Sequence, residues 1–220
     1  PEQLFLKAHL AQLHDGHEIP GFVSGRSGKA DICDSAVLKG PVAVSDGVKI
    51  GPNATIIGPA VIGENVIIEA NAVVGATGLY AKHVDGRFTN MPHFGGVRIG
   101  AGAAILSGAV VVKSAYFGSW TTIGSQAHVG VQSNIGHDAT IGSRTVISSH
   151  VVISGRARVG AGCWIGASAS IANGLDIGDG ASVKIGSVVI ADVAAEQTVS
   201  GNFALDHRRN LLRHARALKG

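Results

Sequence analysis

The sequence has few aromatic residues, few cysteines and no long apolar run. Its 220 residues include two Trp, two Tyr and six Phe against 32 Gly, which excludes a core built around large rings. Such a chain must pack branched aliphatic and small side chains. That composition suits a thin, regular structure better than a globule.

The cysteines and the apolar segments restrict the class of protein further. Cys33 and Cys163 are far apart and form no CxxC pair, which argues against a disulfide scaffold or a zinc site. No run of 18 apolar residues is present, and the N-terminus lacks a basic start followed by an apolar stretch and a cleavage site. We therefore expect a soluble protein of the reducing cytoplasm.

The charge is distributed unevenly along the chain. Residues 1–206 contain 13 Lys or Arg and 15 Asp or Glu, whereas residues 207–220 add five basic residues and no acid. A basic tail on a near-neutral body can attract nucleic acid, a membrane face or an acidic protein. The alternative is the solvated end of a helix.

An aliphatic residue recurs every six positions over most of the sequence. Small residues such as Ala54, Ala139 and Cys163 follow four positions later, and Gly often follows directly, as at Gly51 and Gly136. This pattern predicts a chain that turns a corner every six residues, with one aliphatic side chain inward and small residues where the corner is crowded. The recurring positions are Ile32, Leu38, Val44, Ile50, Ile56, Ile62, Ile68, Val74, Ile99, Ile105, Val111, Phe117, Ile123, Val129, Ile135, Ile141, Ile147, Ile153, Val159, Ile165, Ile171, Ile177, Val183 and Val189.

Neither a helical period of 3.6 nor the alternation of a lone strand fits these residues. The pattern resembles the hexapeptide-repeat family, whose fold is a left-handed parallel β-helix of triangular section with three hexads per coil. The resemblance implies an all-β solenoid of about eight coils over residues 32–192, with three hexads in each coil. Strands stacked about 4.8 Å apart would make a prism roughly 40 Å tall.

One long segment interrupts the repeat. The step from Val74 to Ile99 is one position longer than four hexads, so the frame slips across 75–98, "GATGLYAKHVDGRFTNMPHFGGVR". A loop of this length in a compact protein is usually functional or disordered. Because it contains Tyr80, Phe88 and Phe94, we expect it to fold over the groove of a neighbouring subunit and bind substrate.

Two further segments flank the repeat. Residues 1–31 contain a predicted short helix, "QLFLKAHLAQLH", and a lead-in with a Pro-Gly turn. Residues 193–220 contain a predicted basic amphipathic helix, "ALDHRRNLLRHARALK", with leucines on one face and arginines on the other.

Three histidines lie within the repeat, and their spacing decides between two kinds of site. His128, His137 and His150 fall at different points of the three-hexad coil, so they cannot form one metal cluster in a subunit. His137 is placed on the outer wall, and Gly155 lies three hexads later, one coil above it. A base beside an amide donor is the minimum equipment for acyl transfer. We find no group that orients His137, because Asp138 is expected to point the other way along a strand.

Residues 131–183, from "VQSNIGHDATIG" to "DIGDGASV", resemble the UDP-3-O-(3-hydroxyacyl)glucosamine N-acyltransferases of lipid A synthesis. So do the loop start "GATGLYA", the re-entry "MPHFGGVRIG" and the C-terminal "SGNFALDHRRNLLRHARAL". The resemblance implies that the catalytic histidine falls on His137 and the oxyanion glycine on Gly155. It also implies a homotrimer with sites between parallel prisms.

The departures from that family concern substrate recognition. Of the family's large N-terminal domain, which grips the uridine, only a short helix precedes the repeat in this sequence, so either the domain lies outside the sequence or the protein recognises its substrate differently. The hexads "ILSGAVVVKSAYFG" lack the family's acidic-basic motif, and a second histidine of the family falls on Gly174. These departures bear on the exact lipid A substrate and not on acyl transfer itself.

The sequence therefore predicts an N-acyltransferase that moves an acyl group from a thioester to the amine of a nucleotide-linked amino sugar. No permanently bound cofactor and no metal are expected, and acyl carrier protein or coenzyme A would be the co-substrate. We expect no nucleic acid partner and at most peripheral membrane contact. The candidate site residues are His137 and Gly155 for catalysis, Tyr80, Phe88, Phe94 and Asn134 for substrate, and Arg156, Arg208, Arg209 and Arg213 for the donor.

Three alternatives remain open. The runner-up is an acetyl-coenzyme A-dependent acetyltransferase for a sugar of a surface polysaccharide. A non-catalytic solenoid used in assembly and a zinc carbonic anhydrase are the others.

Overall fold

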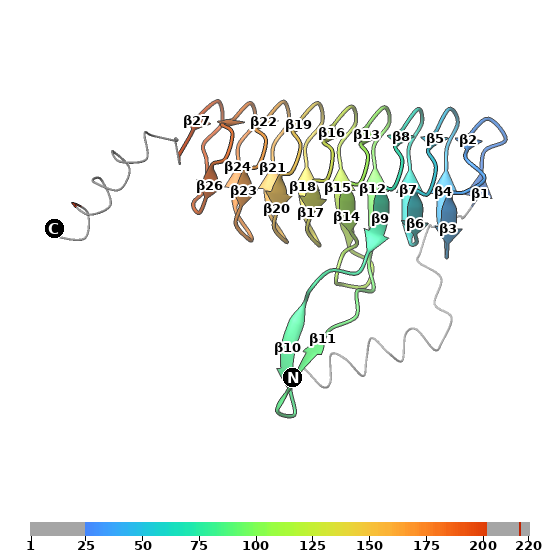
Figure 1. The fold of residues 1–220 in the computed structure, drawn as a ribbon, viewed down its shortest axis with the longest axis horizontal. Helices are drawn as coiled ribbons and strands as arrows, with labels where there is room; N and C mark the ends of the chain where they lie inside the picture. Colours follow the sequence, from blue (N-terminus) through green and yellow to red (C-terminus); the bar gives the residue numbers. More distant parts are fainter. Residues whose placement is uncertain (1–24, 202–215, 217–220) are drawn as a thin grey trace.

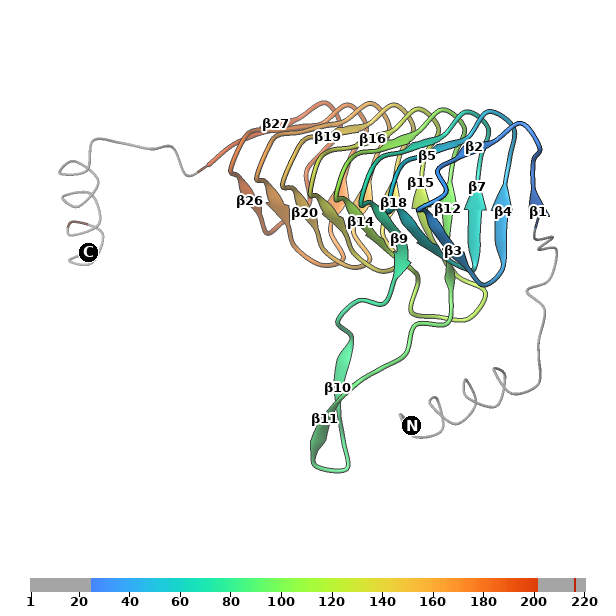
Figure 2. The same ribbon diagram turned by 45° about the vertical axis from the view of Figure 1, so that its right-hand side comes forward.

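The computed structural model describes residues 25–201 and Arg216. Over residues 25–199 the chain forms a parallel β-helix, in which short strands stack into three parallel sheets that make the faces of a prism (Figures 1 and 2). The predicted parallel β-helix solenoid is confirmed. The prism extends beyond the predicted limits of 32 and 192 at both ends. The predicted N-terminal helix and all of the predicted C-terminal helix except Arg216 lie outside the described residues.

Each face is a stack of strands two to four residues long. The first face contains β1 (Gly25–Arg26), β4 (Val42–Val44), β7 (Ala60–Ile62), β12 (Gly96–Ile99), β15 (Trp120–Ile123), β18 (Thr140–Ile141), β21 (Arg158–Val159) and β24 (Asp176–Ile177). The second contains β2 (Asp31–Ile32), β5 (Lys49–Ile50), β8 (Ile67–Ile68), β13 (Ala104–Ile105), β16 (His128–Val129), β19 (Val146–Ile147), β22 (Trp164–Ile165), β25 (Ser182–Val183) and β27 (Thr198–Val199). The third contains β3 (Val37–Lys39), β6 (Thr55–Ile57), β9 (Val73–Ala76), β14 (Val110–Val112), β17 (Asn134–Ile135), β20 (Val152–Ile153), β23 (Ser170–Ile171) and β26 (Val188–Val189).

The hexad determines which residues are buried. The aliphatic residue of each strand points into the prism, and in the later coils each strand pairs with the strand three hexads further on, as Ile135 does with Ile153. Ile135, Ile153 and the small Ala139 are fully buried. Isoleucine columns and small corner residues thus fill the narrow core without aromatic rings.

The corners explain the remaining positions of the hexad. The residue three places after each inward aliphatic has a left-handed backbone in most hexads, as at Asn53 (φ 57°), Asp138 (φ 60°) and Arg156 (φ 61°). The Gly directly after the inward residue serves a different purpose. A Cβ on Gly136 would lie 2.5 Å from the backbone nitrogen of Gly155, so a side chain there would push adjacent coils apart. Gly136 is required because the backbones of adjacent coils approach closely there, and not because its φ is unusual.

Two insertions leave the prism on the same side (Figure 2). Val61 pairs with Arg98, although a regular coil would bring Leu79 to that place. Because β9 and β12 belong to the faces of the prism, the inserted residues are 77–95. The insertion is therefore shorter at both ends than the predicted loop 75–98. It contains the antiparallel hairpin of β10 (Ala81–Val84) and β11 (Arg87–Asn90), which projects away from the coils.

The second insertion was missed by the sequence period. Arg98 pairs with Thr122, although a regular coil would bring Tyr116 to that place, so one extra hexad lies between β14 and β15. Phe117, counted as an inward hexad position, therefore belongs to a loop over residues 113–119 and is only half-buried. An insertion of one hexad keeps the frame and leaves no trace in the period.

No helix among the described residues is long and apolar enough to cross a membrane.

Candidate active site

His137 lies in the turn between β17 and β18, at a corner of the prism and not on the predicted outer wall. Its side chain is only 13% exposed. The corner faces the side from which both insertions leave the prism. His137 is therefore covered by loop residues that a bare coil would not supply.

Asp138 orients His137, contrary to the sequence-based expectation. Nδ1 of His137 lies 2.7 Å from Oδ2 of Asp138. The expectation assumed strand alternation, which places consecutive side chains on opposite sides. Because Asp138 occupies the left-handed corner position, its carboxylate turns back to the preceding imidazole. The Asp138 hydrogen bond holds Nδ1, which leaves Nε2 as the reactive nitrogen.

The Asp138 carboxylate is itself held by the 113–119 loop. Ser114 Oγ donates to Oδ1, and the Ala115 N–H donates to Oδ2 at 3.3 Å. The Asp138 N–H donates to Thr121 Oγ1 at 2.8 Å. Burial raises the pKa of the Asp138 carboxyl, but hydrogen bonds from His137, Ser114 and the Ala115 amide outweigh it and hold the pKa below its usual value. Asp138 is thus ionised beside His137 at neutral pH.

Gly155 lies against the imidazole of His137, as the three-hexad coil predicts. A Cβ on Gly155 would lie 2.6 Å from Nε2 of His137, so only a glycine allows the imidazole its present place. The backbones of the two coils are tied together by the Arg156 N–H, which donates to the His137 carbonyl at 2.8 Å. Among the described residues, the Gly155 N–H donates no hydrogen bond. The residue that lies against the imidazole of His137 therefore has a backbone donor that no described group uses.

Asn173 and Gly174 of the next coil hold the carbonyl of Gly155. With the Asn173 amide oriented so that both its atoms are satisfied, Nδ2 donates to the Gly155 carbonyl at 2.6 Å. Oδ1 then accepts from Arg156 Nη2 at 3.3 Å. The Gly174 N–H also donates to the Gly155 carbonyl, at 3.0 Å. The Gly174 bond recurs at other corners of the prism, as in Gly162 N–H to Ser143 O, whereas the side-chain contacts of Asn173 are particular to this corner.

The segments before and after the β10–β11 hairpin place aromatic rings against His137. The Tyr80 ring lies 5.5 Å from the His137 ring at an interplanar angle of 36°, and the His93 ring lies 5.5 Å from it at 82°. Tyr80 also meets His93 edge-on at 6.3 Å. The base of the loop thus packs on the histidine of its own chain, whereas the whole loop was expected to reach a neighbour.

A second tyrosine extends the cluster. The hydroxyl oxygens of Tyr80 and Tyr116 lie 3.4 Å apart, and Tyr116 comes from the 113–119 loop. The hydrogen bond with Tyr80, with burial adding to it, raises the pKa of Tyr116 above its usual value. Lys82 Nζ lies 5.6 Å from the centre of the Tyr80 ring. Both insertions therefore meet over His137, and the 113–119 loop was hidden from the sequence period.

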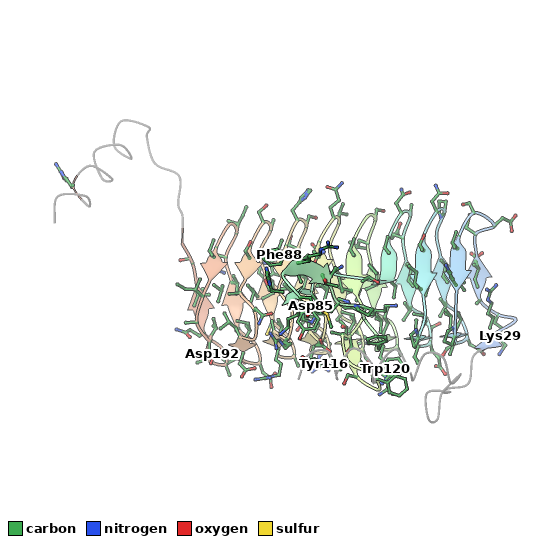
Figure 3. The ribbon with its side chains drawn as sticks, turned by 90° about the horizontal axis from the view of Figure 1, so that it is seen from below. Lys29, Asp85, Phe88, Tyr116, Trp120 and Asp192 are labelled. Atoms are coloured by element: carbon green, nitrogen blue, oxygen red, sulfur yellow. The ribbon has the colours of Figure 1, made fainter. Side chains whose placement is uncertain are left out.

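The remaining predicted site residues are dispersed. Phe88 is 82% exposed at the hairpin and lies in front of the middle coils in Figure 3, whereas Phe94 is 7% exposed and packed at the re-entry to the prism. Asn134 lies on β17, on the outer side of the third face, and is exposed. Arg208, Arg209 and Arg213 lie outside the described residues.

The spacing argument against a metal cluster agrees with where the histidines lie. His128 is on β16 in the second face, and His150 is in the turn after β19. Within residues 25–201, no group of three or more His, Cys, Asp or Glu side chains is arranged to hold a metal ion.

Comparison with known proteins agrees with the repeat. Residues 41–76 match the family model described as bacterial transferase hexapeptide, six repeats. No match to the chain is found among curated proteins.

Solved structures of acyltransferases share the fold of the prism. The UDP-N-acetylglucosamine acyltransferase of Francisella novicida has a TM-score of 0.61 and 22% identity, covering 87% of this chain and 71% of its own. The enzyme of the same name from Bacteroides fragilis has a TM-score of 0.62 and 16% identity, covering 86% of this chain and 78% of its own. The UDP-N-acetylglucosamine O-acyltransferase of Moraxella catarrhalis has a TM-score of 0.55 and 22% identity, covering 85% of this chain and 77% of its own. At these identities the likeness is one of fold.

Proposed function

We propose that this protein is an acyltransferase that moves an acyl group from a thioester to the amine of a nucleotide-linked amino sugar. The observation that carries the proposal is the arrangement of His137, Asp138 and Gly155. A histidine oriented by a carboxylate at 2.7 Å has its Nε2 against Gly155, and no described protein group uses the backbone N–H of that glycine. The resemblance to lipid A N-acyltransferases and the fold shared with sugar acyltransferases support the same chemistry.

The reaction needs one proton to move twice. The amine nitrogen attacks the thioester carbonyl, a C–N bond forms, and the C=O electron pair moves onto oxygen. His137 Nε2 takes a proton from the attacking nitrogen, while the Gly155 N–H stabilises the oxyanion. When the C–S bond breaks, the imidazolium returns the proton to the leaving thiolate. The products are an amide and a free thiol.

Asp138 favours the protonated stage of His137. Its carboxylate accepts from Nδ1 throughout, so the imidazolium forms next to a fixed negative charge. Ser114 and the Ala115 amide hold the Asp138 side chain, and Thr121 holds its backbone. The same contacts prevent Asp138 from rotating away when His137 loses its proton.

We propose a homotrimer in which the hairpin reaches a neighbouring prism. Phe88 and Leu79 are each 82% exposed, and large exposed apolar side chains on a projecting hairpin favour contact with another chain. The predicted substrate residues Phe88 and Asn134 would then belong to two different subunits at one site, with Tyr80 near His137.

For the donor, we propose acyl carrier protein ahead of coenzyme A. The sequence from 207 to 220 has five basic residues and no acid, and a strongly acidic carrier would be steered to it. Arg156, which follows Gly155 and contacts Asn173, would meet a phosphate of either donor. Neutralising Arg208, Arg209, Arg213 and Arg216 should raise KM for the carrier-bound donor, and the effect should weaken with salt.

The proposed function is tested by the products that the protein makes. Purified protein is incubated with UDP-glucosamine and a panel of acyl-carrier and acyl-coenzyme A thioesters, and the sugar nucleotide is analysed by mass spectrometry. A mass increase equal to one acyl group supports the proposal, and the panel gives the acyl length. No acylated product with any donor would contradict it.

A further inference from the structure

His93 has a buried ring nitrogen with no partner beside the proposed base. Its side chain is 5% exposed, and Nδ1 lies 3.3 Å from the Met91 carbonyl oxygen. Nε2 is covered by protein atoms, yet it forms no hydrogen bond within residues 25–201. A buried polar atom left unpaired is destabilising, and folded proteins seldom keep one without a use.

The surroundings of His93 determine which kind of partner Nε2 can take. A carbonyl oxygen only accepts, so in the neutral imidazole the proton is on Nδ1 and Nε2 carries the lone pair. Burial lowers the pKa of His93, electrostatic interaction with His137 and Lys113 lowers it further, and the Met91 carbonyl and Asp138 act in the opposite direction. His93 is therefore neutral at neutral pH, and Nε2 is a hydrogen-bond acceptor.

His137 presents the same arrangement, with its ring centre 5.5 Å from that of His93. Its Nδ1 is held by the Asp138 carboxylate, as Nδ1 of His93 is held by the Met91 carbonyl. Each imidazole thus keeps a lone pair on Nε2, and the rings meet edge to face at 82°. The Tyr80 ring lies near both imidazole rings and comes from the opposite end of the loop.

We propose that His93 is a specificity-determining residue that selects a primary amine over a hydroxyl as the acyl acceptor. This inference rests on the proposed acyl transfer and identifies the group that receives the acyl chain. A primary amine has two N–H groups, one for each histidine, whereas a hydroxyl has a single O–H. His137 takes one proton as the C–N bond forms, and Nε2 of His93 accepts a hydrogen bond from the second N–H. A hydroxyl at the same place leaves His93 Nε2 buried and unpaired.

The bond to His93 also orients the nucleophile. With both N–H groups engaged, the nitrogen lone pair has one remaining direction, which must face the thioester carbonyl. The second proton stays on nitrogen and becomes the N–H of the amide product. His93 therefore moves no proton in the reaction.

Two substitutions at one position separate the roles of the two ring nitrogens. In His93→Asn, the short side chain can still donate to the Met91 carbonyl but has no acceptor at the place of Nε2. In His93→Gln, the longer side chain places its amide near Nε2 and can accept there. His83→Asn is the matched control, because His83 is exposed on β10 and meets Phe88 and not the His137 cluster.

The measurement is kcat/KM with UDP-glucosamine and with UDP-glucose, which has a hydroxyl where the former has the amine, using one acyl thioester. We expect the amine-to-hydroxyl ratio to fall at least about tenfold in His93→Asn, to be largely kept in His93→Gln, and to stay unchanged in His83→Asn. Thermal unfolding of each variant shows whether the prism remains folded. If His93→Asn does not fold, His93→Leu, which also has no acceptor at the place of Nε2, is measured instead, and a ratio in that folded variant equal to that of the wild type overturns the acceptor role.

The two proposals fail in different ways. A wild type that acylates neither sugar overturns the proposed function, and this inference with it. A wild type that acylates the amine, with a folded His93→Asn variant that keeps the same preference, overturns only the role of His93.

Discussion

Nδ1 of His137 lies 2.7 Å from Oδ2 of Asp138, the next residue in the chain. Consecutive side chains can meet in this way because the left-handed backbone of Asp138, with φ of 60°, turns its carboxylate back. The same left-handed corner recurs at this hexad position in most coils. The repeat thus supplies the backbone geometry for a histidine-carboxylate pair, and the two inserted loops supply its surroundings.

Replacing Asp138 by Asn should lower kcat by about 10² to 10⁴, because the amide neither stabilises the imidazolium nor holds the same tautomer. KM for the sugar nucleotide should change little. The measurement is steady-state kinetics on the folded protein. Asp176→Asn, which removes an exposed carboxylate paired with Arg158, should leave kcat unaltered. Equal activity of Asp138→Asn and wild type would remove Asp138 from the mechanism.

Replacing Gly155 by Ala should displace the His137 ring, because the new Cβ would lie 2.6 to 2.9 Å from three of its atoms. A misplacement of about 1 Å can lower activity about 10²-fold, and we expect a loss of that order with little change in the unfolding temperature. Gly28→Ala is the control, since a Cβ there meets nothing within 4 Å. A fully active Gly155→Ala protein would show that the imidazole does not need its present place.

His93 should make the wild type sensitive to mild acid. Its folded-state pKa is lowered by burial, so between the unfolded pKa near 6.5 and the folded value the unfolded chain binds the extra proton. Stability conferred by neutral His93 is therefore present at higher pH and is lost as pH falls below about 6.5. Chemical unfolding from pH 8 to pH 5 should show this loss in the wild type and a smaller loss in His93→Gln. Parallel curves for the two proteins would contradict the burial effect.

The hairpin should contribute to a neighbour's site. We expect the wild type to sediment with a mass of three times 22.3 kDa. We also expect Phe88→Ser to be less active than the wild type, although Phe88 is 82% exposed in the single chain. A co-refolded mixture of Phe88→Ser and His137→Ala should be more active than either variant alone. In a mixed oligomer, the intact hairpin of a His137→Ala subunit can complete the site that contains the intact His137 of a Phe88→Ser subunit. A monomeric wild type, or a mixture no more active than its components, would show that the hairpin does not act across subunits.

The period predicted a chain that turns a corner every six residues, with an inward aliphatic, a close-approach Gly and a small buried corner residue in each hexad, and the resemblance to the hexapeptide-repeat family implied the parallel β-helix. The period also predicted the contact of His137 with Gly155, since the two residues are separated by three hexads, which make one coil. It could not reveal the 113–119 loop, whose extra hexad keeps the frame and carries Ser114 and Tyr116. Asp138 was misjudged because strand alternation was applied to a turn. The environment of His93 depends on the path of the long loop. The repeat does not continue through this loop, so the sequence could not predict which coil residues it contacts.

The most direct test of the account is acyl transfer by His137→Ala, followed by mass spectrometry of the acylated sugar nucleotide. His128→Ala, which changes an exposed histidine on β16, is the matched control. The account predicts that His137→Ala loses at least about 10² in turnover, while its oligomeric state and unfolding temperature match those of the control. Turnover equal to that of His128→Ala in a folded protein would contradict the proposed role of His137.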